Sequence, residues 1–307
     1  MQPDNYTIAE KMIAVGDGHT LYAQLWGNND AAETIIFLHG GPGSGCSDNH
    51  KTNFDPTRQR VIFFDQRGCG KSLPAGKLEA NTTDHSIADI TKVADEFSTS
   101  TFALTGGSWG SCLALAYALK HPKKVTRMVL RGLFTARKSE INFINNGEFA
   151  AFFPEVWEEF LQNTPADKRA NAADYHTARL LGDDPIASKE SAYALSRLEG
   201  SVLRLDDRMA PATADDFAAF DPNGMRIEHH FISQACFLPE GHILANASKI
   251  TMPITLIQGR YDAVCPPYTA YELSKTLPNA RLVWTTAGHS GSDRANWEAT
   301  RAALASI

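Results

Sequence analysis

The stretch FALTGGSWG at residues 102–110 decides the fold. Its apolar start leads into the pattern G-x-S-x-G at residues 106–110, and the helix-like run SCLALAYALK follows at residues 111–120. A strand, a sharp turn and a helix in this order form a nucleophile elbow, in which the turn exposes the serine hydroxyl. Glycines two positions before and after the serine allow the strained turn to close. We therefore predict that Ser108 is a nucleophile.

Other strand-like runs surround this stretch. They are short, apolar and rich in β-branched or aromatic residues, as the buried strands of a parallel sheet are. They lie at residues 34–38, 61–64, 101–104, 125–130, 254–257 and 281–285, and a β-hairpin is predicted around Gly16-Asp17-Gly18. The helical patterns between these runs predict an α/β fold with a mostly parallel sheet and helices on both faces.

The alternation of strands and helices stops in the middle of the chain. Between residues 135 and 248 the pattern is helical and polar, with no convincing strand, and strand-like runs then return. We therefore predict that residues 1–134 and 249–307 form the two parts of an α/β core. Residues 135–248 are predicted to form an inserted helical cap over the ends of the strands.

A glycine-rich loop, HGGPG at residues 39–43, follows the first of the parallel strands. In this arrangement an oxyanion hole takes one N–H from the residue after the serine and one from this earlier loop. The predicted donors are therefore the backbone N–H groups of Trp109 and Gly41. A plain glycine turn is the alternative, but the elbow that follows in the right order favours the oxyanion hole.

A serine nucleophile needs a base, and the base needs an acid that orients it. The expected chain order is serine, aspartate, histidine, with the last two after late strands. Asp262 follows the strand-like run ITLIQG, and His289 follows RLVWTTAG, so we predict these two as the acid and the base. His229 and His230 are adjacent but lack any metal-ligand spacing. No metal and no cofactor are expected.

Composition limits the class of protein. The 307 residues are 43% hydrophobic and 21% charged, with a net charge of −6 and mixed signs, which argues against a nucleic-acid partner. No apolar run suits a signal peptide or a membrane span. The five cysteines form no C-x-x-C pair, so we expect free thiols and a cytoplasmic location. The oligomeric state stays open.

Six segments together resemble the proline iminopeptidases of the α/β-hydrolase fold. They are HGGPGSG at 39–45, DQRGCGKS at 65–72, GGSWGS at 106–111, LRGLF at 130–134, GRYD at 259–262 and GHS at 288–290. The resemblance runs from about residue 10 to the end of the chain. It implies a serine aminopeptidase that releases an amino-terminal proline from small peptides with a free amino terminus, without a cofactor.

The same resemblance assigns residues to the substrate. It implies that Glu199 and Glu228 hold the substrate's amino group, that Arg131 and Phe134 line its pocket, and that Cys265 lies near the site. Helical periodicity separately places each glutamate on an apolar face, where a carboxylate needs a partner. From periodicity alone that partner is either the substrate's amine or a structural cation such as Arg131 or Arg197; the resemblance favours the amine. Cys265 is equally well read as a small buried hydrophobe.

The chain also departs from the family pattern. An aromatic-rich segment at the start of the cap is replaced by Asn142-Phe143-Ile144-Asn145, and a tryptophan before the first glutamate is replaced by Leu198. These changes affect the pocket wall and the strictness of the proline preference. A related hydrolase that acts on esters, lactones or other aminoacyl substrates is the alternative function. A non-catalytic binding protein on the same scaffold is a weaker alternative, because all three triad positions are present.

Overall fold

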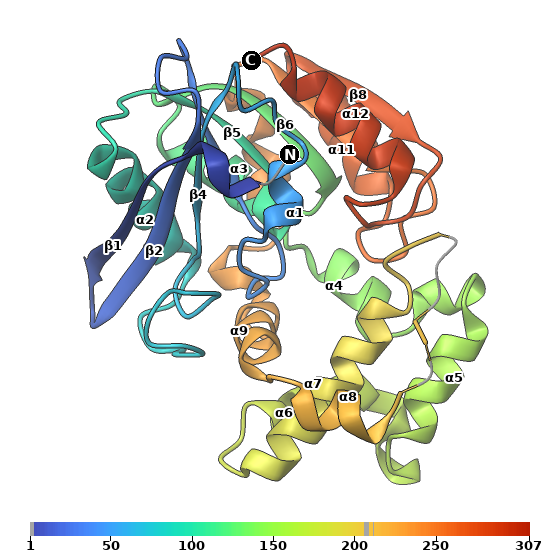
Figure 1. Cartoon of the computed structure of the whole chain (residues 1–307). Coiled ribbons are helices and arrows are strands. Elements are labelled where there is room, and N and C mark those ends of the chain that lie inside the picture. The colour runs from blue at the N-terminus through green and yellow to red at the C-terminus, as the bar shows by residue number, and fades with distance from the viewer. Residues whose placement is uncertain (1–2, 206–208, 211) are drawn as a thin grey trace.

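A computed structural model describes residues 3–205, 209–210 and 212–307 (Figure 1). Eight strands form one sheet in the order β1-β2-β4-β3-β5-β6-β7-β8. The strands are β1 (Thr7–Gly16), β2 (His19–Gly27), β3 (Thr34–Leu38), β4 (Arg60–Phe64), β5 (Phe102–Ser108), β6 (Val125–Leu133), β7 (Ile254–Gly259) and β8 (Ala280–Thr285). Strand β2 pairs antiparallel with both β1 and β4, and all other pairs are parallel. The predicted mostly parallel sheet is confirmed.

Helices follow most of the strands. They are α1 (Asp48–Lys51), α2 (Thr83–Glu96), α3 (Trp109–Lys120), α4 (Lys138–Asn145), α5 (Pro154–Gln162), α6 (Ala172–Leu180), α7 (Pro185–Gly200), α8 (Ala214–Ala219), α9 (Asn223–Ile232), α10 (His242–Asn246), α11 (Tyr268–Thr276) and α12 (Arg294–Leu304). Short 3₁₀ turns lie at Pro3–Tyr6, Glu148–Ala151, Ala166–Asn171, Ala235–Phe237 and Ala247–Lys249. Among the residues described, no helix combines the length and apolar character that a membrane crossing requires.

The central strands are apolar throughout because both of their faces are covered. Successive residues of β3 illustrate this: Ile36 packs in the core that includes α2, α3 and α11, whereas Ile35 packs in the core that includes α12. Side chains alternate between the faces of a strand, so a strand covered on one face alone would alternate in polarity. This explains why the continuous apolar runs in the sequence indicated a doubly covered sheet.

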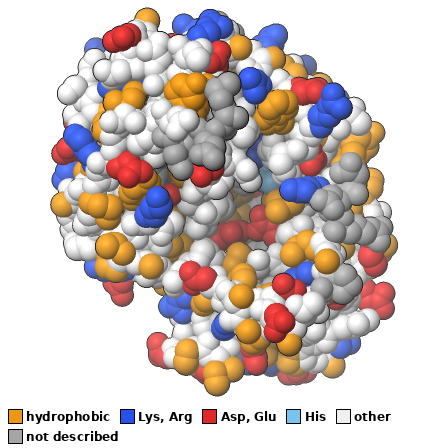
Figure 2. Space-filling view, in the orientation of Figure 1, with side chains coloured by type: hydrophobic (Ala, Val, Ile, Leu, Met, Phe, Trp, Pro, Cys, Tyr) orange, Lys and Arg blue, Asp and Glu red, His pale blue; other side chains and the backbone are white. Residues whose placement is uncertain are grey.

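Between β6 and β7 the described residues form helices only, from α4 to α10. Helices α5 to α8 stand apart from the sheet in Figure 1, and Figure 2 shows a hollow between the two parts. The helical part has its own apolar cluster, which includes Phe149, Phe160, Leu180 and Leu195. Ile227, by contrast, packs in the larger core of the sheet. We propose that residues 135–248 act as a cap whose last helices are anchored in the α/β core.

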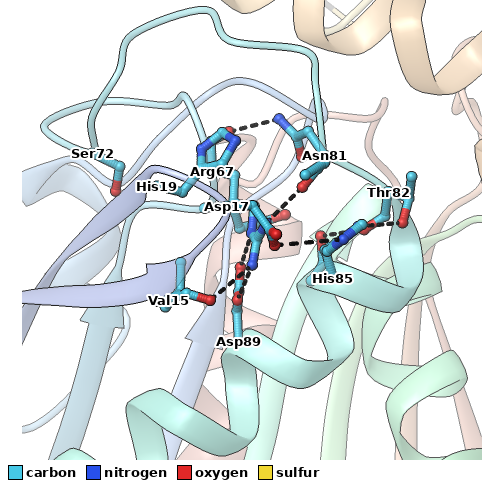
Figure 3. A network of polar contacts seen from close by, with 12 residues as sticks. Val15, Asp17, His19, Arg67, Ser72, Asn81, Thr82, His85 and Asp89 are labelled. Carbon is cyan, nitrogen blue, oxygen red and sulfur yellow. Dashed lines mark hydrogen bonds and ion pairs between the residues drawn. The ribbon is translucent and has the colours of Figure 1, made fainter.

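A buried ion pair fixes the loop that follows β4. The Arg67 guanidinium donates from Nε to Asp89 Oδ2 at 2.7 Å and from Nη2 to Asp89 Oδ1 at 2.9 Å. Its Nη1 donates to the Ala80 carbonyl at 2.6 Å and reaches Asp17 in the turn between β1 and β2 (Figure 3). Arg67 thus ties three segments to helix α2. The motif DQRGCGKS is therefore in large part a structural element.

Replacing Asp89 with alanine is expected to lower the free energy of unfolding by about 3–5 kcal/mol, because Arg67 would be left buried without its carboxylate. Asp84 in the same helix is a matched control, since its ion pair with Lys120 is exposed. Asp84→Ala is expected to cost less than about 1 kcal/mol. Urea unfolding followed by circular dichroism measures both changes, and equal losses would contradict a structural role for the Arg67–Asp89 pair.

Candidate active site

Ser108 lies at the junction of β5 and α3 with φ 57° and ψ −128°, a strained conformation for a residue other than glycine. The glycines beside it are required by close packing against the end of β3. A Cβ atom on Gly106 would lie 2.6 Å from the Leu38 carbonyl oxygen, and one on Gly110 would lie 2.2 Å from the same atom. The strain and the close approach together hold Ser108 at the carboxyl end of the sheet, where active sites of open α/β sheets lie.

Asp262 and His289 are in direct contact. His289 Nδ1 donates to Asp262 Oδ2 at 2.8 Å, and both side chains are buried. The other carboxylate oxygen of Asp262, Oδ1, accepts the backbone N–H groups of Val264 at 3.0 Å and Cys265 at 2.8 Å. Because Nδ1 carries the proton in this contact, Nε2 is left free to act as a base. Ser108 and His289 line the same cavity.

Gln258, on β7, contacts the predicted acid, and the sequence analysis did not identify it. Its Nε2 donates to Asp262 Oδ2 at 3.0 Å and to the Cys265 carbonyl at 3.1 Å, while its Oε1 accepts the Leu133 N–H at 2.8 Å. This fully buried amide therefore holds the Asp262 carboxylate from the side opposite the Oδ1 contacts. The only signal for it in the sequence is a polar residue at the end of the apolar run ITLIQG.

Gln66, from the motif DQRGCGKS, joins the two loops that carry the predicted oxyanion donors. Its Nε2 donates to the His39 carbonyl at 3.0 Å, and its Oε1 accepts Trp109 Nε1–H at 2.8 Å. Its backbone N–H donates to His39 Nε2 at 3.0 Å. Burial lowers the pKa of His39, so its ring is neutral and Nδ1–H contacts the Gly40 carbonyl. Gln66 therefore links the loop that contains Gly41 to the side chain of Trp109.

Two cavities meet at Ser108. The smaller one, of about 70 Å³, is lined by Phe134, Glu228 and Cys265 among others; the larger one, of about 670 Å³, is lined by Arg131 and His289. Ser108, Gly41 and Glu199 line both. The structure thus brings Phe134, Glu199 and Glu228 together but places Arg131 on the other side of the predicted nucleophile.

The smaller cavity contains two carboxyl groups in contact. Glu199 on α7 and Glu228 on α9 are hydrogen-bonded through their side chains, and acidic side chains are visible in the hollow of Figure 2. Burial, the negative charge of Glu199 and this hydrogen bond raise the pKa of Glu228 well above its usual range. Two carboxyl groups this close share a proton, because both cannot ionise at low cost.

Neither glutamate has a cationic partner within the described residues. Arg131 donates to the carbonyl of His289 instead, and Arg197 donates to the carbonyl of Ala210 at 2.7 Å. The structural salt bridge that the sequence left open is therefore absent from the described part of the chain. The carboxyl pair faces a cavity, where a bound cation would be its partner.

Residues that depart from the family pattern line the same small cavity: Ile144, Asn145 and Leu198 form part of its wall. Cys265 also lies there. Burial raises the pKa of the Cys265 thiol well above its usual range, although a hydrogen bond with Ser108 acts in the opposite direction. The thiol is therefore protonated at neutral pH and is a weak nucleophile beside Ser108.

His229 and His230 point to different partners, Thr177 Oγ1 at 2.8 Å and the Asn81 carbonyl at 2.9 Å. No group of three or more histidine, cysteine, aspartate or glutamate side chains suited to a metal ion occurs in the described residues.

Comparison with known proteins agrees with this arrangement. Residues 33–293 match the alpha/beta hydrolase fold family, and the chain belongs to it. An esterase from Exiguobacterium antarcticum shares the fold, with a TM-score of 0.66 and 19% identity over 97% of this chain and 99% of the other. The structure of proline iminopeptidase from Mycobacterium smegmatis superposes with a TM-score of 0.60, at 21% identity and 97% coverage of both chains.

Sequence relatives narrow the assignment. Proline iminopeptidase from Arabidopsis thaliana is 39% identical over 92% of this chain and 75% of its own length. Proline iminopeptidase from Neisseria gonorrhoeae is 36% identical over 92% and 90%, respectively. Within the α/β-hydrolase fold, this chain therefore belongs to the proline iminopeptidase family.

Proposed function

We propose that this protein is a serine aminopeptidase that releases an amino-terminal proline from peptides through an acyl-enzyme intermediate. The observation that carries the proposal is the Glu199–Glu228 pair in a small cavity beside Ser108. A proton-sharing pair that has no cationic partner in the described part of the chain is suited to bind a protonated amine. The close relatives named proline iminopeptidase support the choice of proline.

In the proposed reaction His289 Nε2 takes the proton of Ser108, and the serine oxygen attacks the carbonyl carbon of the amino-terminal residue. The N–H groups of Gly41 and Trp109 stabilise the oxyanion. Asp262 holds the His289 ring and stabilises its positive charge, and His289 then protonates the leaving amine. Water, activated by the same histidine, hydrolyses the ester and releases proline.

The size of the smaller cavity supports the exopeptidase function. Its volume of about 70 Å³, with Phe134 in its wall, suits the ring of one residue better than a longer chain. The carboxyl pair at its end favours a charged amine over an acylated one. The substrates we propose are therefore small peptides with a free amino terminus.

We also propose that the enzyme acts in the cytoplasm. All five cysteines are free thiols, and four of them are buried without a disulfide partner. Free cysteines in this number suit a reducing compartment.

Gln66→Leu is expected to lower kcat by about 10- to 100-fold with little change in KM, because the two oxyanion loops lose their shared amide. Gln59→Leu is the matched control. Gln59 is also a buried glutamine bonded to two backbone groups, at Leu304 and Asp55, but it lies away from the site. Steady-state kinetics and thermal unfolding are measured for both variants. A loss of stability in both, with kcat lowered only in Gln66→Leu, is the expected result; equal kcat values would contradict the role of Gln66.

A panel of substrates tests the proposed function. Prolyl-, hydroxyprolyl-, alanyl- and leucyl-arylamides are compared with N-acetyl-prolyl-arylamide and with a simple aryl ester. The expected result is that prolyl-arylamide is preferred and that acetylation of its amine lowers kcat/KM by about 100-fold or more. Indifference to acetylation, with faster cleavage of the ester, would instead identify an ester or lactone hydrolase.

A further inference from the structure

Arg131 lies on β6 directly beside the elbow, in register with Gly107 of β5. The guanidinium fills space that two glycines leave open. A Cβ atom on Gly107 would lie 2.4 Å from its Nη2, and one on Gly291 would lie 3.2 Å from its Nε. This packing holds the cation at the wall of the larger cavity, next to Ser108.

The charge of Arg131 is not neutralised by an ion pair within the described part of the chain. Its Nη1 donates to the His289 carbonyl, which leaves most of its five N–H donors without an acceptor among the residues that the structure describes. The nearby carboxylates have other partners. Asp262 is engaged by His289, Gln258 and two backbone N–H groups, and Asp293 Oδ2 accepts the Gly288 N–H at 2.8 Å. A guanidinium that remains charged at neutral pH therefore faces the cavity.

His50 supplies a second donor to the same cavity. Its Nδ1 accepts the backbone N–H of Ser47 at 3.0 Å, so the proton of the neutral ring is on Nε2. Burial, together with the positive charge of Arg131, lowers the pKa of His50 to about 4, which keeps the ring neutral at pH 7. Besides His289 and Trp297, the remaining polar lining is serine, threonine and asparagine, with Glu199 at the border with the smaller cavity.

The larger cavity is the side from which the leaving group departs. The proposed function places the amino-terminal residue in the smaller cavity with Glu228, and His289, which protonates the leaving amine, lines only the larger one. The residue after the scissile bond therefore enters the cavity that contains Arg131 and His50. The two sides of Ser108 carry opposite charges, as the two ends of a zwitterionic dipeptide do.

We propose that Arg131 and His50 form a subsite for the carboxylate of the leaving residue, so that the enzyme prefers prolyl dipeptides with a free carboxyl terminus. This inference rests on the proposed aminopeptidase function. Arginine binds a carboxylate through two parallel N–H···O bonds, which favours this anion over a neutral amide. Arg131 also orients the His289 carbonyl, so the test must separate substrate recognition from this positioning role.

The test compares prolyl-glycine with prolyl-glycinamide, which differ only in the carboxylate, and uses prolyl-arylamide as a reference without one. Wild-type enzyme is expected to show a kcat/KM ratio of acid to amide of about tenfold or more. Arg131→Met is expected to bring that ratio close to one. Any displacement of His289 in this variant lowers kcat/KM for all three substrates equally and therefore cancels in the ratio. Arg131→Lys, which keeps the charge but not the planar fork, is expected to give an intermediate ratio. Arg260→Met is the control, because Arg260 stacks on Trp284 and does not line the cavity; its ratio is expected to match that of wild type.

The outcomes separate the two proposals. If wild-type enzyme cleaves prolyl-arylamide but treats the acid and the amide alike, the carboxylate subsite is wrong and the aminopeptidase function stands. The subsite is also wrong if Arg131→Met, or Arg131→Lys where the methionine variant does not fold, keeps the full wild-type ratio. If prolyl-arylamide is not cleaved at all, the proposed function itself fails.

Discussion

Ser108→Ala is expected to lower kcat for prolyl-arylamide by about 10⁵- to 10⁶-fold, the loss found when a serine nucleophile is removed from a triad. Without the hydroxyl no acyl-enzyme forms, and only the oxyanion donors and substrate binding still assist attack by water. The thermal midpoint is expected to change little, because alanine keeps the Cβ atom and meets the same strain at φ 57°. Steady-state assays and labelling by a fluorophosphonate measure the two consequences.

Ser98 offers a matched control for this variant. It also has a positive φ, 53°, but it is exposed and lines neither cavity at Ser108. Ser98→Ala is therefore expected to keep kcat within about twofold. Combining Ser108→Ala with His289→Ala is expected to add little further loss, because the two residues act as a unit. Residual activity above about 1% in Ser108→Ala would show that another group is the nucleophile.

The sheet could be predicted from the sequence, and a candidate triad could be proposed from it, because both rest on local sequence patterns. Strands covered on both faces must be apolar throughout, and an elbow needs glycines at fixed positions around its serine. Asp262 and His289 are found from their places after strands, since the ends of parallel strands meet at one edge of the sheet. These inferences do not depend on how distant side chains pack.

Contacts between distant segments are the part that the sequence does not reveal. Gln66 and Gln258 act through single amides that join loops far apart in the chain, and nothing in their neighbours indicates such partners. Periodicity places Glu199 and Glu228 on the apolar faces of their helices, but only the packing of α7 against α9 brings the two carboxyl groups into contact.

The positions of Arg131 and Phe134 also could not be predicted from the sequence, although the two residues are close together in the chain. Only two residues lie between them, and the resemblance places both in one pocket, yet they line different cavities. The pairing of β5 with β6 shifts register where Gly132 takes a positive φ of 54°. A strand irregularity of this kind changes the direction of the side chains that follow it. The sequence shows a glycine at this position but not the direction in which its neighbours point.

Glu228→Gln is expected to lower kcat/KM for prolyl-arylamide by about 100- to 1,000-fold, because glutamine cannot release a proton and the pair can then no longer gain a second negative charge beside the substrate's amine. For the N-acetylated substrate, which carries no cation, kcat/KM is expected to change much less. Glu158→Gln on the exposed side of α5 is the control, and it is expected to leave kcat/KM for both substrates unchanged. A loss below about threefold for the free-amine substrate would contradict amine binding by the carboxyl pair.

The same substitution is expected to stabilise the free enzyme. The pKa of Glu228 is raised in the folded protein, so its contribution to stability is fully present below the unfolded pKa and is lost as the pH rises through the folded pKa. Glutamine carries no such cost, and it can donate a hydrogen bond to Glu199. At pH 8 the thermal midpoint of Glu228→Gln is therefore expected to exceed that of wild type by about 2–4 °C, and the difference should shrink at pH 5. A variant that loses both activity and stability would point to a structural role. Lower activity together with a higher thermal midpoint follows only if the two carboxyl groups destabilise the free enzyme and the substrate's amine relieves that cost.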